Sequence, residues 1–409
     1  MLELSSAEAN MLALEGLGMR HKHASTLEVV ERLGLLQVDS VNVFERAHYL
    51  PLFSRMGSFD KSQLDDLQTI EPGNSHPKLI EYWAHEASLI PIERLPLYKF
   101  RMDAAHDDSR PNRWRDWANS NQDLCQWILN EIGTKGPLTV SQIEHDSNVR
   151  KGSWWGWSDA KQALEWLFMT GELVSGGRDK FSRRYALPEQ VLTAHIVERL
   201  HTVDNHQARK TLLTHAAGVH AVATDKDLAD YHRMKLTTVR PLLRELVEEG
   251  KIRAAKVAGW KEPAFISLEA AASLNATESA KSTNPTTILS PFDPVVWNRD
   301  RALRMFNFDY RIEIYTPKEK RIFGYYSLPI LHNRKLIGRV DLKSDRQNSA
   351  LLVQSCWAEN WLDDKQKASA AAGLAKNLKD AQKWQKLDQI KVEPAGNLSA
   401  ETANALGVR

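Results

Sequence analysis

Apolar side chains recur at helical spacing at the start of the chain, and the pattern changes after residue 34. Residues 6–17 and 26–33 carry apolar positions three and four residues apart, which predicts two helices. A serine at the start of the first helix can cap it, and Gly34 closes the second. Residues 37–43 are instead rich in β-branched side chains, so we expect a strand there.

The middle of the chain repeats one order of elements. Residues 164–173 match residues 243–252 in apolar pattern, and each stretch is a helix that ends at a glycine. A β-hairpin is predicted after each helix, and the first of these has a glycine turn at 176–177. Repeated helix-turn-helix units, each followed by a hairpin, indicate winged-helix modules.

The last third of the chain has a different pattern. Short apolar runs with polar turns predict a small β-barrel or sandwich; the runs are Tyr310–Tyr315, Phe323–Leu328, Lys335–Val340 and Ala350–Ser355. Residues 361–390 predict a terminal helix with a frayed end. The expected fold class is α+β, and its parts are a first winged-helix module with the candidate catalytic motif (1–105), a second (118–190), a third (205–268), a β-barrel (287–356) and a helical segment (357–393).

Composition narrows the functional class only a little. The 409 residues have a net charge of +2, so local clusters rather than the whole chain must carry any affinity for nucleic acid. Two distant cysteines, Cys125 and Cys356, argue against a disulfide framework, and no metal-binding motif is visible. We see no secretory leader and no apolar run that could span a bilayer, and we expect a cytoplasmic protein.

The predicted strand near residue 40 holds the most suggestive pair of polar side chains. In a strand, side chains i and i+2 lie on one face, so Gln37 and Asp39 point the same way while Val38 turns into the core. An amide beside a carboxylate can position a water next to a developing positive charge. The alternative from spacing alone is a pair of strand-edge residues that bond the backbone.

Several motifs together resemble one family. They are Gln-Val-Asp at 37–39, Arg-Ala-His at 46–48, Leu-Phe-Ser-Arg at 52–55, Tyr-Trp-Ala-His-Glu-Ala at 82–87 and Leu-Ser-Pro-Phe-Asp-Pro-Val at 289–295. This set resembles the YcaQ/AlkZ-type winged-helix DNA glycosylases, and its Asp39 matches the YcaQ branch. The resemblance implies that Gln37 and Asp39 are catalytic. It also implies base excision repair of alkylated purines, such as N7-alkylguanine and bulky adducts, and unhooking of interstrand crosslinks. The expected partner is double-stranded DNA that carries such purines. We expect the protein to be a monomer associated with the nucleoid.

The chemistry of an N-glycosidic bond is consistent with this motif. Cleavage passes through an oxocarbenium-like sugar, which a carboxylate stabilises electrostatically. The same carboxylate can orient or deprotonate the attacking water. A polysaccharide glycosidase would need a second acid, which is not visible, whereas an alkylated cationic base leaves readily. No lysine lies near the motif, which favours hydrolysis by a monofunctional enzyme without cofactor or metal.

Other residues are candidates for the DNA-binding surface. A helix is predicted through Arg46 and His48, and these two residues with Arg55 could anchor phosphates or hold a cleft, with a helix-face salt bridge as the alternative for each. The run 79–91 is predicted as one strand. The cleft-lining candidates on it are Tyr82, His85 and Glu86, and the alternative is a buried histidine satisfied by the glutamate.

The first predicted hairpin has a basic tip. Lys180, Arg183 and Arg184, with Arg178, could follow phosphates as a wing does, or could be a solvated surface. The tryptophan cluster at 154–157 is either a staple between modules or an aromatic wall at the DNA. A winged-helix transcription regulator without catalysis is the alternative function; it would have no need of the Gln-apolar-Asp strand.

Overall fold

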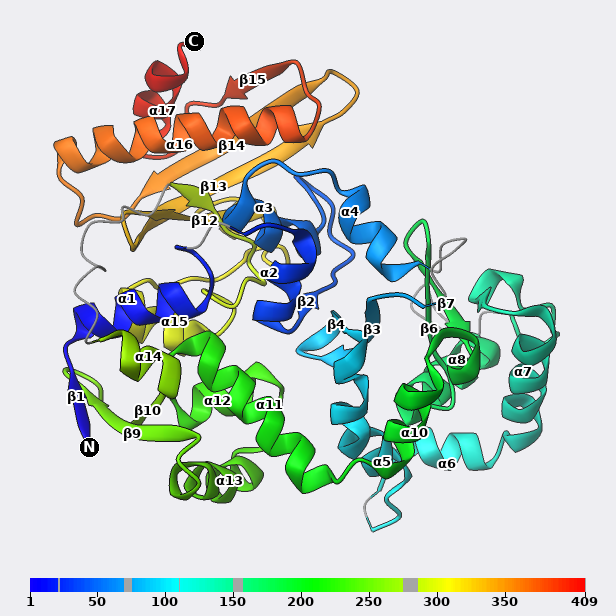
Figure 1. The fold of residues 1–409 in the computed structure, drawn as a ribbon. Coiled ribbons are helices and arrows are strands. Elements are labelled where there is room, and N and C mark those ends of the chain that lie inside the picture. Colours follow the sequence, from blue (N-terminus) through cyan, green and yellow to red (C-terminus); the bar gives the residue numbers. More distant parts are fainter. Residues whose placement is uncertain (21–22, 70–75, 110, 150–156, 275–285, 409) are drawn as a thin grey trace. The chain divides into compact units, whose positions relative to one another are not determined.

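The chain forms two compact units in the computed structural model, which describes residues 1–409 apart from 21–22, 70–75, 110, 150–156, 275–285 and 409 (Figure 1). The first unit joins residues 1–61 to residues 213–409, and the second comprises residues 62–212. The boundary at 61/62 falls inside the expected first module, and each unit is described by itself. Of the tryptophan cluster at 154–157, residues 154–156 lie outside the described residues, and the exposed Trp157 packs edge-on against Trp114 with ring centroids 5.3 Å apart.

The first unit contains most of the helices and two sheets. Its elements are β1 (Leu2–Leu4), α1 (Ser6–Gly16), α2 (Thr26–Leu33), β2 (Leu36–Gln37), η1 (Ala47–Tyr49), α3 (Leu50–Met56), β8 (Val222–Thr224), α12 (Asp225–Tyr231), α13 (Leu236–Glu248), β9 (Ile252–Val257), β10 (Ala264–Ser267), α14 (Leu268–Ser273), β11 (Thr287–Ile288), α15 (Arg299–Phe306), η5 (Lys318–Lys320), β12 (Ser327–His332), β13 (Lys335–Asp345), β14 (Ala350–Ala358), α16 (Asp364–Trp384), β15 (Gln389–Val392) and α17 (Ser399–Leu406). Helix α11 (Asn205–His220) begins in the second unit and ends in the first.

The second unit has shorter elements. They are α4 (Ser62–Asp65), η2 (Asp66–Gln68), β3 (Leu79–Ala84), β4 (Glu86–Pro91), η3 (Ile92–Tyr98), α5 (Lys99–His106), α6 (Arg113–Asn119), α7 (Gln122–Lys135), β5 (Leu138–Thr139), η4 (Val140–Gln142), α8 (Asp159–Thr170), β6 (Val174–Asp179), β7 (Ser182–Ala186), α9 (Pro188–Val191) and α10 (Ala194–Thr202). Strands β5, β7 and β6 form an antiparallel sheet, and β3 and β4 form a hairpin.

The predicted helix starts are confirmed where a side chain caps them. Ser5 accepts a hydrogen bond from the Glu8 backbone N–H at the start of α1. Ser158 does the same for the Lys161 N–H at the start of α8. Gly34 ends α2 in the left-handed conformation, with φ 75°, which a glycine adopts without steric cost. Local chemistry alone therefore sets these boundaries.

The C-terminal sheet is a curled half-barrel rather than the closed barrel that the sequence predicts. Its order is β11-β12-β13-β14-β15, and among the described residues the two edge strands do not pair with each other. Helix α16 packs against this sheet and α17 packs against α16 (Figure 1). The predicted strand at 310–315 is wrong, because that segment is irregular. The end of the chain is not frayed, because β15 pairs in parallel with β14 and α17 follows.

Two further predictions are corrected in part. The run 79–91 is not one strand but the hairpin β3–β4, which turns at His85, so Tyr82 and Glu86 lie on different strands. The wing-like hairpin β6–β7 exists, but its two glycines lie within β6 and the turn is at Lys180, whose φ is 55°. In both cases the apolar pattern identifies extended backbone but does not locate the turn.

Candidate functional site

The candidate catalytic motif occupies the end of β2 and the first residues after it. Regular pairing ends at Gln37, so the strand is shorter than predicted, but the backbone is not helical. Leu36 and Val38 are buried, whereas Gln37 and Asp39 are partly exposed. This alternation puts the two polar side chains on the side opposite the apolar ones, as expected of an extended segment.

The Asp39 carboxylate is held by one local hydrogen bond. The backbone N–H of Val41 donates to Asp39 Oδ1 at 2.8 Å, which is an Asx turn. Among the residues that the structure describes, Asp39 Oδ2 has no hydrogen-bond partner. The bond fixes the carboxylate while one oxygen stays available to a water or a substrate.

Two elements that are distant in sequence form hydrogen bonds to the backbone before and after this segment. The Tyr231 hydroxyl donates to the Leu33 carbonyl at 2.6 Å, just before the Gly34 cap. Beyond Asp39, the Ser344 N–H donates to the Val43 carbonyl at 3.0 Å and the Ser344 hydroxyl to the Phe44 carbonyl at 2.8 Å. The motif is thus held between α12 and β13, which makes its geometry rigid.

Helix α16 supports the same segment through aromatic contacts. The Trp384 ring stacks on Phe53 with centroids 4.7 Å apart and lies 6.3 Å from the Phe44 ring. The Trp384 indole N–H also donates to the Phe59 carbonyl at 3.0 Å. These rings pack together around Phe44, in the segment that follows the motif, and bury apolar area there.

A tyrosine that sequence reasoning did not single out lies close enough to Asp39 to be affected by its charge. Tyr326 is fully buried at the start of β12. Burial raises the pKa of the Tyr326 phenol, and the Asp39 carboxylate raises this pKa further. The phenol therefore stays protonated and able to donate at every physiological pH. Tyr326 lies in the predicted strand run 323–328 and in a Gly-Tyr-Tyr motif that also resembles the family, but neither pattern predicts a position near Asp39.

The other candidates in the first unit have different environments. Arg46 is partly exposed and precedes the short helix η1, where a longer helix is predicted. His48 is buried in η1, and its ring centroid lies 4.3 Å from that of Tyr49. Arg46 thus remains a candidate for contact with a ligand, whereas His48 lies in the packed interior.

Arg55 is part of a buried ion pair. Its Nη1 and Nη2 atoms donate to the two carboxylate oxygens of Asp293 at 2.7 and 3.0 Å, and both side chains are fully buried. Further bonds run from Nε to the Leu17 carbonyl at 2.8 Å and from Nη1 to the Pro51 carbonyl at 2.9 Å. The guanidinium therefore joins α3 to the run 289–295, so that two of the motifs that carry the family resemblance meet here.

The candidates on β3 and β4 lie in the second unit. Tyr82 is buried and donates from its hydroxyl to the Met169 carbonyl at 2.9 Å, and burial raises the pKa of this phenol. His85 is buried at the hairpin turn, whereas Glu86 is exposed with φ 56°. The Ser88 hydroxyl donates to the His85 carbonyl at 2.8 Å. Of the three, Glu86 alone has an exposed side chain.

The basic hairpin β6–β7 divides into internal and outward cations. Arg178 and Arg183 both pair with Glu81 of β3, whose carboxylate is buried, and Arg183 also binds Glu165 at 3.1 Å. Lys180 at the turn is exposed, and no carboxylate of the described residues lies within 4 Å of it. The outward charge of the hairpin is thus smaller than its sequence suggests.

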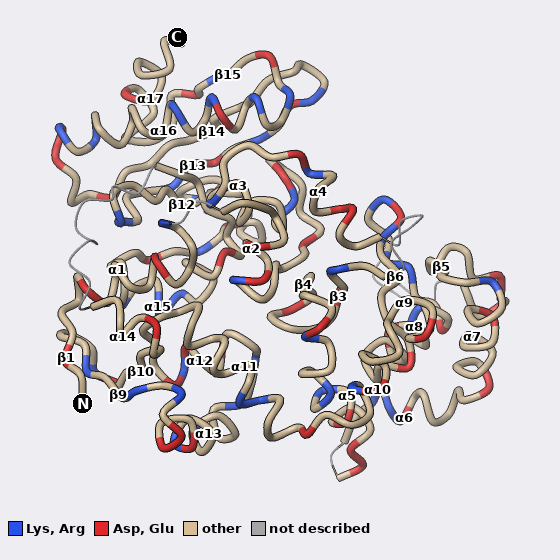
Figure 2. Tube along the Cα trace, in the orientation of Figure 1, with Lys and Arg blue, Asp and Glu red and all other residues tan. Residues whose placement is uncertain are grey.

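Charge is dispersed over the described chain. Lysine and arginine alternate with aspartate and glutamate along both units (Figure 2), in line with the small net charge. Within the described residues, no group of three or more histidine, cysteine, aspartate or glutamate side chains could hold a metal ion. No helix in that same part of the chain is long and apolar enough to cross a membrane. Both cysteines are buried thiols.

The comparisons with known proteins give the class of protein. Residues 30–384 match the family model described as DNA glycosylase AlkZ-like. The solved structure of the Streptomyces sahachiroi DNA glycosylase AlkZ is similar in fold, with a TM-score of 0.61 and 16% sequence identity over 95% of this chain and 100% of that one. The chain belongs to the AlkZ-like DNA glycosylase family.

Proposed function

We propose that this protein is a monofunctional DNA N-glycosylase that hydrolyses the bond between the sugar and an alkylated purine. The observation that carries the proposal is the Asp39 carboxylate, which is partly exposed and, among the described residues, hydrogen-bonded through Oδ1 and not through Oδ2. An oxygen held in this way can face the oxocarbenium ion or orient the attacking water. Gln37, on the same side of the backbone, supplies an amide that can position that water.

We also propose a particular substrate class, which the family assignment alone does not specify. We infer that the enzyme acts as a monomer on duplex DNA with N7-alkylguanine or bulky purine adducts and that it unhooks interstrand crosslinks, as the YcaQ branch does. An aspartate at position 39, as in that branch, supports this assignment. A cationic alkylated base leaves without protonation, so one carboxylate suffices.

The proposed DNA surface uses the exposed cations. Two segments, α7–β7 and α11–β10, each run through helix, strand, helix and hairpin in that order. This order supports the interpretation of both segments as winged-helix modules. The proposed phosphate contacts are the exposed Lys180 and the partly exposed Arg46 and Arg184, although the Arg184 guanidinium also donates to the Pro137 carbonyl at 3.1 Å. The buried Arg55 and Arg183 are proposed instead to position the backbone around the site, because phosphate could reach them only if their ion pairs opened.

A single-turnover assay on duplexes with N7-methylguanine tests the catalytic proposal. Asp39→Asn removes the charge and keeps the shape, so we expect base release to fall about a hundredfold, or roughly 3 kcal/mol, at unchanged DNA affinity. Asp309→Asn is the matched control, because Asp309 is an exposed aspartate of the same unit. A Gln37 substitution should slow the reaction less. Wild-type rates in Asp39→Asn would refute the assignment and favour a DNA-binding protein without this chemistry.

A further inference from the structure

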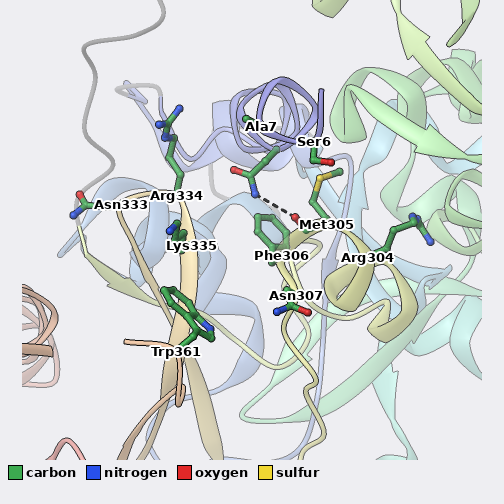
Figure 3. A pocket seen from close by; sticks show the side chains of 11 residues that line it. Ser6, Ala7, Arg304, Met305, Phe306, Asn307, Asn333, Arg334, Lys335 and Trp361 are labelled. Atoms are coloured by element: carbon green, nitrogen blue, oxygen red, sulfur yellow. Dashed lines mark hydrogen bonds between the residues drawn. The ribbon is translucent and has the colours of Figure 1, made fainter. Parts of the chain in front are cut away.

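A cavity of about 510 Å³ opens in the first unit, on residues that the catalytic proposal does not use (Figure 3). The start of α1, the end of α15, the turn between β12 and β13, and Trp361 form its walls. Asn10 of α1 holds two of these walls together, because its side-chain amide donates to the Met305 carbonyl at 3.4 Å. The volume is in the range of sites for small organic ligands.

The positive charge of this cavity is incompletely neutralised. Among the described residues that line it are Arg304, Arg334 and Lys335, and none of these lining residues is a carboxylate. Among the described residues, no carboxylate lies within 4 Å of Arg334 or Lys335. Arg304 pairs with Asp227, but Arg301 shares that same carboxylate, so two guanidinium groups face one acid. An anionic ligand would supply the missing charge.

The turn that carries Arg334 has a backbone conformation that is unfavourable for an arginine. Asn333 and Arg334, with φ 46° and 67°, are the two residues between the paired His332 and Lys335. A two-residue hairpin turn with both φ values positive favours glycine at its second position. Arginine there is strained, and its exposed side chain contributes nothing to the turn itself. A role for the guanidinium in binding accounts for its presence.

An aromatic surface lies beside these cations. Trp361 is 41% exposed, and the Lys335 ammonium lies 5.0 Å from the centroid of its ring. A second hollow of about 150 Å³ shares Asn333, Lys335 and Trp361 with the first. Exposed aromatic rings between cations bind unpaired nucleic acid, because bases stack on the ring while phosphates meet the charges. Two hollows on one tryptophan suit successive nucleotides of a strand.

We propose that this cavity is a second, non-catalytic nucleic-acid site that binds an unpaired DNA strand, with phosphate on Arg334 and Lys335 and a base against Trp361. Asn10 and Asn333 line the same cavity, where the Asn10 amide bonds the Met305 carbonyl and the Asn333 amide contacts the His332 ring at 2.9 Å. Such a site would hold single-stranded DNA next to a lesion or at an end. It does not depend on Asp39, so it can stand or fall without the glycosylase proposal.

The test is fluorescence anisotropy of a labelled twelve-nucleotide oligo(dT) with the full chain. We expect Trp361→Ala to weaken binding about tenfold or more, because a stacked base is lost. Arg334→Gly should weaken binding and flatten its salt dependence by about one ion. Because glycine suits the turn, this variant should melt at the same temperature as the wild type or higher, which separates binding from folding.

The matched control is Arg346→Ala. This exposed arginine lies in the turn at the opposite end of β13, so the variant removes the same charge from the same sheet. It should bind as the wild type does. Equal losses in Arg346→Ala and Arg334→Gly, or wild-type binding in Trp361→Ala, would overturn the proposal.

A competition experiment distinguishes a free nucleotide from a DNA strand as the occupant of the cavity. If thymidine monophosphate at millimolar concentration displaces oligo(dT) from the wild type, the cavity takes free nucleotides and the strand proposal is wrong. If an unlabelled oligomer displaces the probe and the monophosphate does not, the occupant is a strand. Asp309→Asn, at an exposed aspartate outside the cavity lining, should leave all these affinities unchanged.

Discussion

Replacing Arg55 should lower the free energy of unfolding of the first unit by several kcal/mol. It should leave the salt dependence of DNA binding unchanged. The Arg55 guanidinium makes two bonds to Asp293, at 2.7 and 3.0 Å, and two to backbone carbonyls, with no exposure of either charged side chain. Arg55→Met removes these four bonds and a fifth, from Nη1 to the Ser54 hydroxyl at 3.0 Å, and leaves a buried carboxylate whose remaining donor is the Val295 N–H at 3.0 Å. Breaking a buried ion pair from one side costs about 3–5 kcal/mol.

Urea denaturation followed by circular dichroism measures this cost. We expect Arg55→Met to lower the free energy of unfolding by that amount, and Arg55→Lys to lower it less, because lysine keeps the charge without the two-pronged geometry. The double variant Arg55→Met with Asp293→Asn should be more stable than the sum of the single losses implies, by at least about 1 kcal/mol. Additive losses, or a loss below about 1 kcal/mol for Arg55→Met, would refute the reasoning.

DNA binding provides the second arm of this prediction. A phosphate contact contributes about 0.9 to the slope of log affinity against log salt concentration. The folded Arg55→Lys protein should keep the wild-type slope. Lys180→Gln should reduce the slope, because Lys180 is the exposed cation of the β6–β7 turn. A reduced slope in Arg55→Lys would mean that this arginine reaches DNA after all.

Two further predictions follow from buried charges. Burial by itself would raise the pKa of Asp227, but Arg301 and Arg304 outweigh it and lower this pKa to about 2. The resulting stability, about 2–3 kcal/mol, is present above pH 4 and lost as the pH falls from about 4 towards 2; urea titrations across that range should show the loss in the wild type and not in Asp227→Asn. Arg183→Met should destabilise the second unit by about 1–3 kcal/mol, because it removes one of the two arginines that pair with the buried Glu81 and leaves that carboxylate to Arg178. A thermally stable Arg183→Met protein with a weaker salt dependence of DNA binding would contradict this.

Local chemistry was readable from the sequence by itself. Capping serines and a C-terminal glycine fix helix ends within a few neighbouring residues, so α1, α2 and α8 were predicted closely. The alternation that sets Gln37 and Asp39 apart from Val38 also depends only on extended backbone, and the structure keeps it. The family motif could be recognised because it is contiguous.

Tertiary structure decided which charged groups are left for a ligand. Arg55 and Arg183 look like surface cations in sequence, but their partners, Asp293 and Glu81, lie 238 and 102 residues away and bury them. The nearness of Tyr326 to Asp39 and the cavity around Trp361 likewise join segments distant in sequence. No local pattern encodes such pairings, because the free energy of burying a charge depends on the partner that the fold supplies.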